Sequence, residues 1–156
     1  MITQDMIQEC IGNLKKNGFD AHFVEDVGMA KEMILNMILG YESFGVGGSD
    51  TVRSMNIVKE LKIKGKVVYD HWEEGLTKEQ DLDLRLRQGR CDCFLCSANA
   101  ISASGEIVNI DGIGNRVAAM SFGPKKVMIV AGVNKITPDL ASAIKRAREI
   151  AGPLRA

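Results

Sequence analysis

The sequence predicts an α/β protein with a Rossmann-like, mostly parallel sheet and flanking helices. Two observations support this prediction. From residue 44 onward, short apolar segments alternate with segments whose apolar residues have helical spacing, which is typical of βαβ units. Residues 126–133 contain a continuous apolar run, as expected for a strand buried on both faces of a parallel sheet. A chain of 156 residues fits one domain, with N-terminal helices over about 3–40 and an α/β core over about 44–152.

Two helices are expected before the sheet begins. Thr3 can cap the first helix, whose apolar residues lie on one face and which ends at Gly18. The second helix is expected over 29–39, with Ala30, Met33 and Ile34 on its apolar face. The methionines of both helices suit irregular core packing.

The predicted core begins with a short strand at Phe44 that runs into a glycine turn. The further elements expected along the chain are a helix over 50–61, a strand over 66–70, a helix over 77–87 with Leu82, Leu84 and Leu86, a strand over 91–96, a hairpin over 100–109, a short helix over 115–120 and a strand over 126–133. A last helix starts at Thr137-Pro138-Asp139. Its inward-facing residues are expected to be Leu140, Ile144, Ala147 and Ile150.

Composition excludes several classes of function. The net charge is zero and aromatic residues are few, so neither an electrostatic footprint nor a stacking surface for nucleic acid is predicted. The longest apolar runs are short and interrupted by glycine, which predicts no membrane span. Four cysteines without an N-terminal export signal indicate a reducing, cytoplasmic location.

The glycine turn at Gly47-Gly48-Ser49-Asp-Thr51 is the first candidate site. Small residues between a strand and a helix let backbone amides approach an anion, and Ser49 and Thr51 add hydroxyl donors. The functional interpretation is a cradle for phosphate, carboxylate or a phosphorylated cofactor. The structural alternative is a tight turn capped by Ser49 or Asp50.

The turn matches no complete nucleotide motif. It lacks the Gly-Lys-Ser/Thr of a P-loop, and Asp50 stands where a dinucleotide fingerprint has its last glycine. Asp70 ends the next strand at a distance suited to a ribose hydroxyl, which keeps a nucleotide alternative open.

The cysteines and histidines have both structural and functional interpretations. Cys91, Cys93 and Cys96 are poorly spaced for a metal or iron–sulfur site, and in a strand Cys96 would point away from the other two. We therefore expect buried core thiols and no metal. His71 is expected in a polar surface loop, although it could act as an acid or base.

A second set of polar residues follows predicted strands and turns. Its members are Asn99, Asp111, Gly112, Asn115, Arg116, Asn134 and Lys135. Ligands in parallel α/β sheets bind beyond the carboxyl ends of strands, so we expect Asn99, Asn134 and the glycine turn along one edge. Arg116 and Lys135 could bind an anion, and Glu106, Asp111 and Lys135 are the candidates for acid–base work. The structural alternative assigns these residues to turns, caps and ion pairs.

These motifs closely resemble the LUD domain, the lactate-utilisation protein family. The resemblance rests on Gly47-Gly-Ser49-x-Thr51, Ser97-Ala-Asn99-Ala-Ile-Ser, Gly105-Glu-Ile-Val-Asn-Ile-Asp111-Gly-x-Gly-Asn115-Arg116-Val-Ala-Ala, Phe122-Gly-Pro-Lys-Lys-Val and Gly132-Val-Asn134-Lys135, and it extends from the N-terminal helices to Gly152-Pro153.

The resemblance implies a fold like that of ribose-5-phosphate isomerase, glucosamine-6-phosphate deaminase and CoA transferases. It further implies a role in using L-lactate or related organic acids, with a small anionic metabolite or phosphorylated ligand. Some family members act with iron–sulfur and flavin-type partners, and many continue into a cysteine-rich tail, whereas this chain ends at Ala156. The alternative is a non-catalytic binding or regulatory module. The sequence is also compatible with a homodimer.

Overall fold

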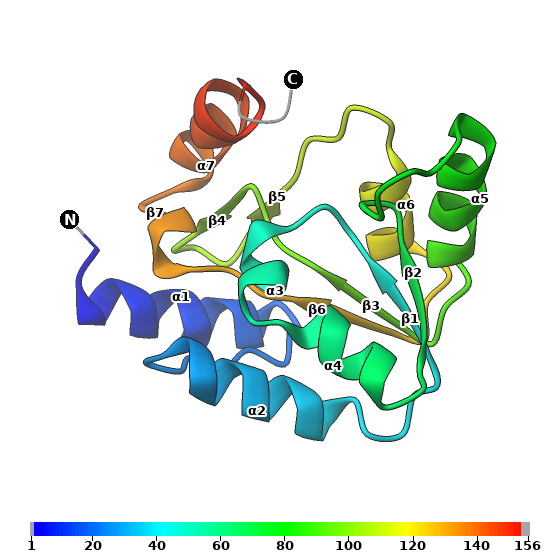
Figure 1. The fold of residues 1–156 in the computed structure, drawn as a ribbon. Helices are drawn as coiled ribbons and strands as arrows, with labels where there is room; N and C mark the ends of the chain where they lie inside the picture. Colours follow the sequence, from blue (N-terminus) through cyan, green and yellow to red (C-terminus); the bar gives the residue numbers. More distant parts are fainter. Residues whose placement is uncertain (1, 154–156) are drawn as a thin grey trace. The chain divides into compact units, whose positions relative to one another are not determined.

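The computed structural model describes residues 2–153, which divide into two compact units (Figure 1). The parallel-sheet unit comprises residues 25–97 and 113–130, and the hairpin unit comprises residues 2–24, 98–112 and 131–153. The expectation of one domain over 1–156 stays a prediction.

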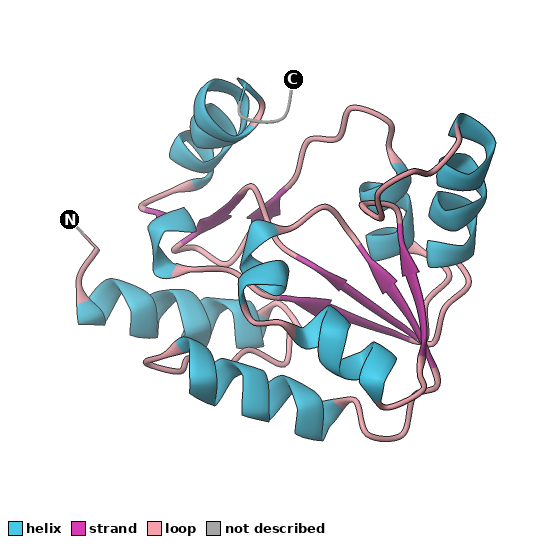
Figure 2. Cartoon of the chain, in the orientation of Figure 1, coloured by secondary structure: helices cyan, strands magenta, loops and turns pink. Residues whose placement is uncertain are grey.

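The parallel-sheet unit contains four parallel strands (Figure 2). These are β1 (Ser43–Val46), β2 (Val67–Asp70), β3 (Cys93–Cys96) and β6 (Lys126–Ile129), in the order β2-β1-β3-β6. The chain moves from β1 to one side for β2 and to the other side for β3. The order thus reverses at β1, as in doubly wound folds, and this confirms the predicted Rossmann-like α/β class.

Helices cover both faces of this sheet. The first face carries α2 (Val27–Met37), α3 (Asp50–Ser54) and α4 (Ile57–Ile63), and the second carries α5 (Lys78–Gln88) and α6 (Asn115–Ser121). Ile34, Val52 and Leu61 pack with strand residues in the first core. Ala119 packs with Phe94 in the second. The sheet is therefore buried between two helical layers, as its apolar strands predicted.

Two helices of this unit differ from expectation. The helix predicted over 50–61 is broken at Asn56, which has a left-handed φ of 55° and separates α3 from α4. In α5, Leu82 and Leu86 are exposed although they were expected to be its main apolar residues, and the buried residue is Gln88. Leu82, Leu84 and Leu86 alternate at intervals of two, a spacing that cannot place all three on one helical face.

The hairpin unit contains a second, three-stranded sheet. Its strands are β4 (Ala100–Ser102), β5 (Ile107–Val108) and β7 (Ile136–Thr137), in the order β5-β4-β7. β4 pairs antiparallel with β5, which confirms the predicted hairpin, and parallel with β7. The helices are α1 (Gln4–Lys16), the 3₁₀ turn η1 (Val133–Lys135), α7 (Leu140–Arg146) and the π-helical segment η2 (Ala147–Ala151).

Helix α1 holds the hairpin turn in place. Thr3 caps the helix by accepting from Met6 N, as predicted. Farther along, the Nδ2 groups of Asn13 and Asn17 donate to Ala103 O and Gly105 O, each at 2.9 Å. Gly105 has a φ of +94°, and a Cβ there would lie 2.8 Å from the Asn13 backbone. The turn therefore requires glycine both for its conformation and for its contact with α1.

Two predictions in the C-terminal segment are wrong. The strand expected over 126–133 ends at Ile129, so Asn134 and Lys135 lie in η1 and do not close a strand. In the last helix, Ala147 is buried as expected and Ala143 is buried as well, whereas the other expected inward residues, Leu140, Ile144 and Ile150, are 41%, 38% and 51% exposed. Small residues let this helix approach the hairpin closely, and a pattern based on large apolar residues misses such a face.

All four cysteines are buried. Cys93 packs in the core beside α2 and α4, whereas Cys91 and Cys96 pack with Phe94 on the other face. The expectation that Cys91 and Cys93 share a face is wrong, because Cys91 precedes the strand. Burial raises the pKa of Cys91 to about 11 and that of Cys93 to about 12. Within residues 2–153, no three His, Cys, Asp or Glu side chains cluster so that they could hold a metal.

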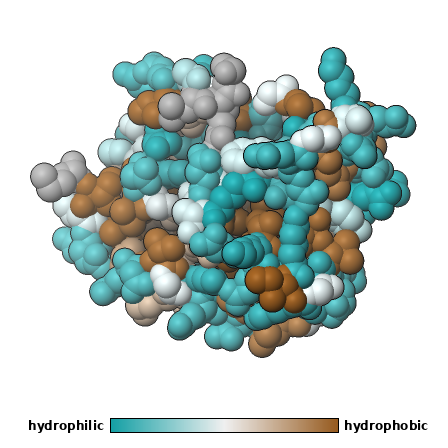
Figure 3. Space-filling view, viewed as in Figure 1, coloured by the Kyte–Doolittle hydropathy of each residue, from teal (hydrophilic) through white to brown (hydrophobic). Residues whose placement is uncertain are grey.

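No helix in the described chain combines the length and the apolar character needed to cross a bilayer. The face shown in Figure 3 is largely hydrophilic, with hydrophobic residues interspersed.

We expect Gly45→Ala to destabilise the parallel-sheet unit. A Cβ at Gly45 would lie 2.9 Å from Phe94 Cδ2 and 3.0 Å from both Cys91 Sγ and Gln88 Cα. Overpacking of this kind costs about 1–3 kcal/mol, which urea unfolding followed by Trp72 fluorescence measures. Gly40→Ala is the matched control, because nothing lies within 4 Å of its added Cβ. Equal stability of both variants contradicts the predicted overpacking at Gly45.

The cysteines are predicted to be unreactive in the folded protein. Their burial and the raised pKa values of Cys91 and Cys93 keep the thiolate population small near neutral pH. Native protein treated with an aromatic disulfide reagent should therefore release little chromophore, whereas urea-unfolded protein should release it from all four thiols. Rapid native labelling of Cys91 or Cys93, identified by mass spectrometry, contradicts the buried assignment.

Candidate functional site

The candidate site of the parallel-sheet unit lies where the strand order reverses. β1 ends at Val46 and continues into the glycine turn, and β3 ends at Cys96 and continues into Ser97. Gly47 N donates to Leu95 O at 2.9 Å, so the turn leaves the sheet directly beside β3. In open α/β sheets, the crevice between the carboxyl ends of two such strands is where ligands bind.

Close packing accounts for both glycines of the turn. A Cβ on Gly47 would lie 3.1 Å from Cys96 Cβ and 3.5 Å from Arg116 Cγ. On Gly48 it would lie 2.9 Å from Cζ2 of the Trp72 ring. The turn thus runs close to Arg116 and Trp72. Because this packing alone requires glycine, a binding role for Gly47 and Gly48 stays a prediction.

Ser49 has the structural role that the sequence left open. Its side chain accepts from Val52 N at 3.2 Å, caps α3 and is only 2% exposed. Thr51 lies in the first turn of α3 and is half-buried. Ser54 Oγ donates to Thr51 O at 2.9 Å. The capped turn that the sequence offered as an alternative is therefore present, and ligand contacts by the two hydroxyls stay predictions.

Helix α6 brings Arg116 to the gap between β1 and β3. The helix begins after Gly114, whose φ of +93° allows a sharp entry. The Arg116 side chain passes Gly47, and its Nη1 lies 3.5 Å from Ser97 O, at the outer limit of a hydrogen bond. Of the predicted residues, Gly47 and Arg116 therefore lie close together, and Asn115 precedes Arg116 in α6.

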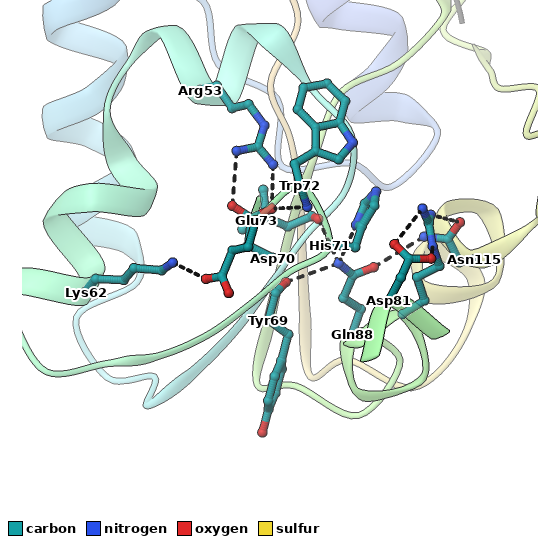
Figure 4. Close-up of polar contacts among 12 residues, drawn as sticks. Arg53, Lys62, Tyr69, Asp70, His71, Trp72, Glu73, Asp81, Gln88 and Asn115 are labelled. Atoms are coloured by element: carbon teal, nitrogen blue, oxygen red, sulfur yellow. Dashed lines mark hydrogen bonds and ion pairs between the residues drawn. The ribbon is translucent and has the colours of Figure 1, made fainter. Parts of the chain in front are cut away.

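An ion pair next to the turn was not foreseen. Arg53 Nη1 and Nη2 both donate to the carboxylate of Asp70, the first at 3.0 Å, and the Arg53 guanidinium lies 4.2 Å from the centre of the Trp72 ring (Figure 4). Asp70 also accepts from Trp72 N. Burial raises the pKa of Asp70, but the Arg53 and Trp72 hydrogen bonds outweigh it and hold the pKa below its ordinary value. This carboxylate is thus engaged, which weighs against the ribose contact proposed for a nucleotide.

His71 is buried, and the expectation of a surface loop is wrong. Its side chain reaches inward, where Nδ1 lies 2.8 Å from Gln88 Nε2. Burial, followed by the charge of Arg85, lowers the pKa of His71. Gln88 is fully buried, and nothing in its local sequence distinguishes it from the exposed polar residues of α5. Only the packing of α5 against β1 and β2 reveals it.

In the hairpin unit, Asn99 and Asn134 have structural contacts. Asn99 Oδ1 accepts from Ile110 N at 2.8 Å, and Asn99 N donates to Asn109 Oδ1 at 3.2 Å, so Asn99 closes the hairpin. Arg146 bonds the carbonyls of both Asn99 and Asn134.

The acid–base candidates also belong to the hairpin unit. Glu106 accepts from Ser104 Oγ at 2.7 Å, and hydrogen bonds from Ser104 and Ser102 lower its pKa, which makes it a weaker base. Asp111 and Gly112 follow β5 without regular structure, and Lys135 ends η1. Ligand or catalytic roles for these residues stay predictions.

A hollow of about 520 Å³ lies on α3 and α4. It is lined by Arg53, Asn56, Val58, Lys59, Lys62 and Ile63. None of the predicted site residues lines it, and two of its cations are already paired, Arg53 with Asp70 and Lys62 with Glu73 (Figure 4). The hollow is therefore a weaker candidate than the reversal of strand order.

Comparison with known proteins gives a family. A family model described as "LUD domain" matches residues 7–154, and the family is associated with lactate utilisation. No curated protein and no solved structure matches the chain significantly. Because the match covers nearly the whole sequence, the chain belongs to the LUD-domain family.

Proposed function

We propose that this LUD-domain protein binds a small anionic metabolite or a phosphorylated cofactor in the use of L-lactate or related organic acids. The proposed ligand lies against the glycine turn at Gly47–Ser49, with Arg116 as its cationic contact. Family membership supports the role in organic-acid metabolism. The geometry of the parallel-sheet unit supports the proposed position of the ligand.

The observation that carries the proposal is the position of Arg116 at the reversal of strand order. Its side chain runs past Gly47 toward Ser97, so a guanidinium lies at the crevice where open α/β sheets bind ligands. Arginine presents a planar fork of donors that matches the two oxygens of a carboxylate or phosphate. Lactate, pyruvate and phosphate esters all carry such a group.

The neighbouring residues suit a small ligand. Gly47 N already donates to Leu95 O, so a ligand would depend on the backbone donors beyond it, at Gly48 and Ser49. α3 has five residues, so we assign little of the anion preference to a helix dipole. The Trp72 ring beside Gly48 provides an apolar wall. One cation, turn amides and an aromatic wall together suit an anion with a short carbon chain.

The second candidate function is a non-catalytic binding or regulatory module. It is favoured by the engagement of the reactive groups near the turn, because the Ser49 hydroxyl caps α3 and Asp70 is held by Arg53. Ligand that binds but stays unchanged in one-dimensional NMR spectra over hours would favour this module. Chemical conversion would favour an enzyme, and iron–sulfur or flavin-type partner subunits remain part of that enzyme proposal.

Ligand binding is expected to change the fluorescence of Trp72. This is the only tryptophan of the chain, and it touches Gly48. We expect at least one of sulfate, inorganic phosphate, L-lactate, pyruvate and ribose 5-phosphate to bind with a Kd near or below about 1 mM. Arg116→Ala should weaken that binding about tenfold or more, the value of a charged hydrogen bond, and Arg116→Lys should restore it only in part.

Arg90→Ala is the matched control, since Arg90 is an exposed arginine of the same unit outside the proposed site. It should bind as the unchanged protein does. If none of the five anions alters Trp72 fluorescence or the melting temperature up to about 10 mM, an anion site at this turn is excluded at the affinities expected for metabolites.

A further inference from the structure

Gln88 links the two segments that carry the proposed anion site. Its Nε2 donates to Val46 O at 2.9 Å, directly before Gly47, and its Oε1 accepts from Asn115 Nδ2 at 3.3 Å, directly before Arg116 (Figure 4). Gln88 is 0% exposed. One buried carboxamide thus joins the end of β1 to the first residue of α6.

The direction of every hydrogen bond in this network is fixed. Val46 O and Tyr69 O can only accept, so the atom of Gln88 that faces them must be the amide nitrogen. Its distance to Tyr69 O is 3.1 Å. At the other end, Arg85 Nη1 can only donate, and it lies 3.1 Å from Asn115 Oδ1. The Asn115 amide nitrogen therefore faces Gln88 Oε1.

These directions determine the protonation of His71. Gln88 Nε2 has two hydrogens for three neighbours, Val46 O, Tyr69 O and His71 Nδ1, the last at 2.8 Å, so one N–H is shared between two acceptors. Because an amide nitrogen accepts no hydrogen bond, a proton on His71 Nδ1 would oppose these donors, and the arrangement favours the neutral imidazole with its proton on Nε2. The chain of donors runs from Arg85 through Asn115 and Gln88 to His71, and Asp81 holds Arg85 at 2.7 Å. If the Gln88 amide were turned around, its own oxygen would face the two carbonyl oxygens, and none of the three could donate a hydrogen bond.

We propose that Gln88 is the positioning residue of the anion site, and that it keeps Gly47 and Arg116 in place only while His71 is neutral. The proposal rests on the proposed function, because the ligand is the anion assigned there. Protonation of His71 Nδ1 sets a donor against a donor and forces Gln88 or His71 to move. Movement of Gln88 releases Val46 O on one side and Asn115 on the other.

The charged groups that face His71 influence the pH at which its imidazole becomes protonated. Arg85 of α5 and Arg53 of α3 oppose the imidazolium, whereas Asp81 of α5 and Asp70 of β2 favour it. Burial is the largest influence, and together these groups place the pKa of His71 below its ordinary value of 6.5. A histidine with a depressed pKa is neutral above that pKa, so anion binding should be full at neutral pH and weaken as pH falls through the lowered pKa of the folded protein.

The test uses sulfate, whose charge is constant from neutral to mildly acid pH, and Trp72 fluorescence at about pH 7.5 and at the lower pH where NMR titration finds His71 protonated. The unchanged protein should bind sulfate several-fold more tightly at the higher pH. Gln88→Leu should weaken binding about tenfold at the higher pH, the effect of losing a buried hydrogen bond, and should bring the ratio of the two affinities close to one. His71→Asn, which keeps an acceptor near the Nδ1 position but cannot titrate, should also bring this ratio close to one.

Two control variants and one NMR measurement separate positioning from lost stability. Met55→Ala removes a buried core side chain of the same unit, which does not belong to the Gln88 network, and should keep the pH ratio. His22→Asn alters the other histidine, which is exposed and pairs with Asp20, and should keep the ratio as well. Long-range ¹H–¹⁵N NMR, which distinguishes the tautomers, should find the His71 proton on Nε2 without any ligand and a changed tautomer balance in Gln88→Leu.

The outcomes separate the two proposals. If the unchanged protein binds none of the anions, the proposed function fails and this inference fails with it. If sulfate binds but Gln88→Leu and His71→Asn keep both the affinity and the pH ratio, the positioning role alone is overturned. A His71 proton found on Nδ1 in the unliganded protein also overturns it.

Discussion

The close approach of α5 to β1 is the constraint on which the parallel-sheet unit depends. At the central strand, a Cβ on Gly45 would lie only 3.0 Å from Gln88 Cα, so the glycine allows the helix to sit directly against the strand. This brings the Gln88 carboxamide to the last carbonyl of β1 and the next-to-last carbonyl of β2. A buried carbonyl without a donor is costly, and one side chain supplies Val46 O and Tyr69 O together.

The same constraint connects the two faces of the sheet. On one face, Gln88 links α5 and α6 to the sheet. On the other face, the Arg53–Asp70 pair and the Trp72 ring link α3 to the end of β2. The glycine turn lies close to groups of both networks, because Gly47 follows Val46 and Gly48 touches Trp72. We infer that the turn is held in a defined conformation before any ligand arrives. Such preorganisation lets a small anion bind without first paying to order a loop.

Local patterns in the sequence predicted the local structure well. The cap at Thr3, the hairpin over 100–109 and the four parallel strands follow from spacing and turn chemistry, and the structure has them. The break at Asn56 was missed because asparagine is also tolerated within helices. Ala143, a buried residue of the last helix, was missed because small residues carry little hydrophobic signal.

The site was predicted less completely because its contacts are long-range. Arg116 was identified from its motif, but Gln88 and His71 look like ordinary polar residues until α5 is placed on β1. Ser49 shows the opposite difficulty, because the sequence identified the residue but not its role. Its hydroxyl could equally cap a helix or bind an anion, and only the 3.2 Å contact with Val52 N shows that it does the first. Sequence therefore identified where polar groups gather and not which of them are already engaged.

The parallel-sheet unit should respond to acid in two separable steps, at Asp70 and at His71. Asp70 has a depressed pKa, so its contribution to stability is present above its ordinary value of 3.8 and is lost as pH falls through the lower, folded value. His71 also has a depressed pKa, but its ordinary value of 6.5 lies well above that of Asp70. Because the ordinary pKa values of the two groups lie far apart, the Gln88 network can change while the Arg53–Asp70 pair still holds α3 to β2. A response of the glycine turn to mild acid can therefore occur in a protein that remains folded.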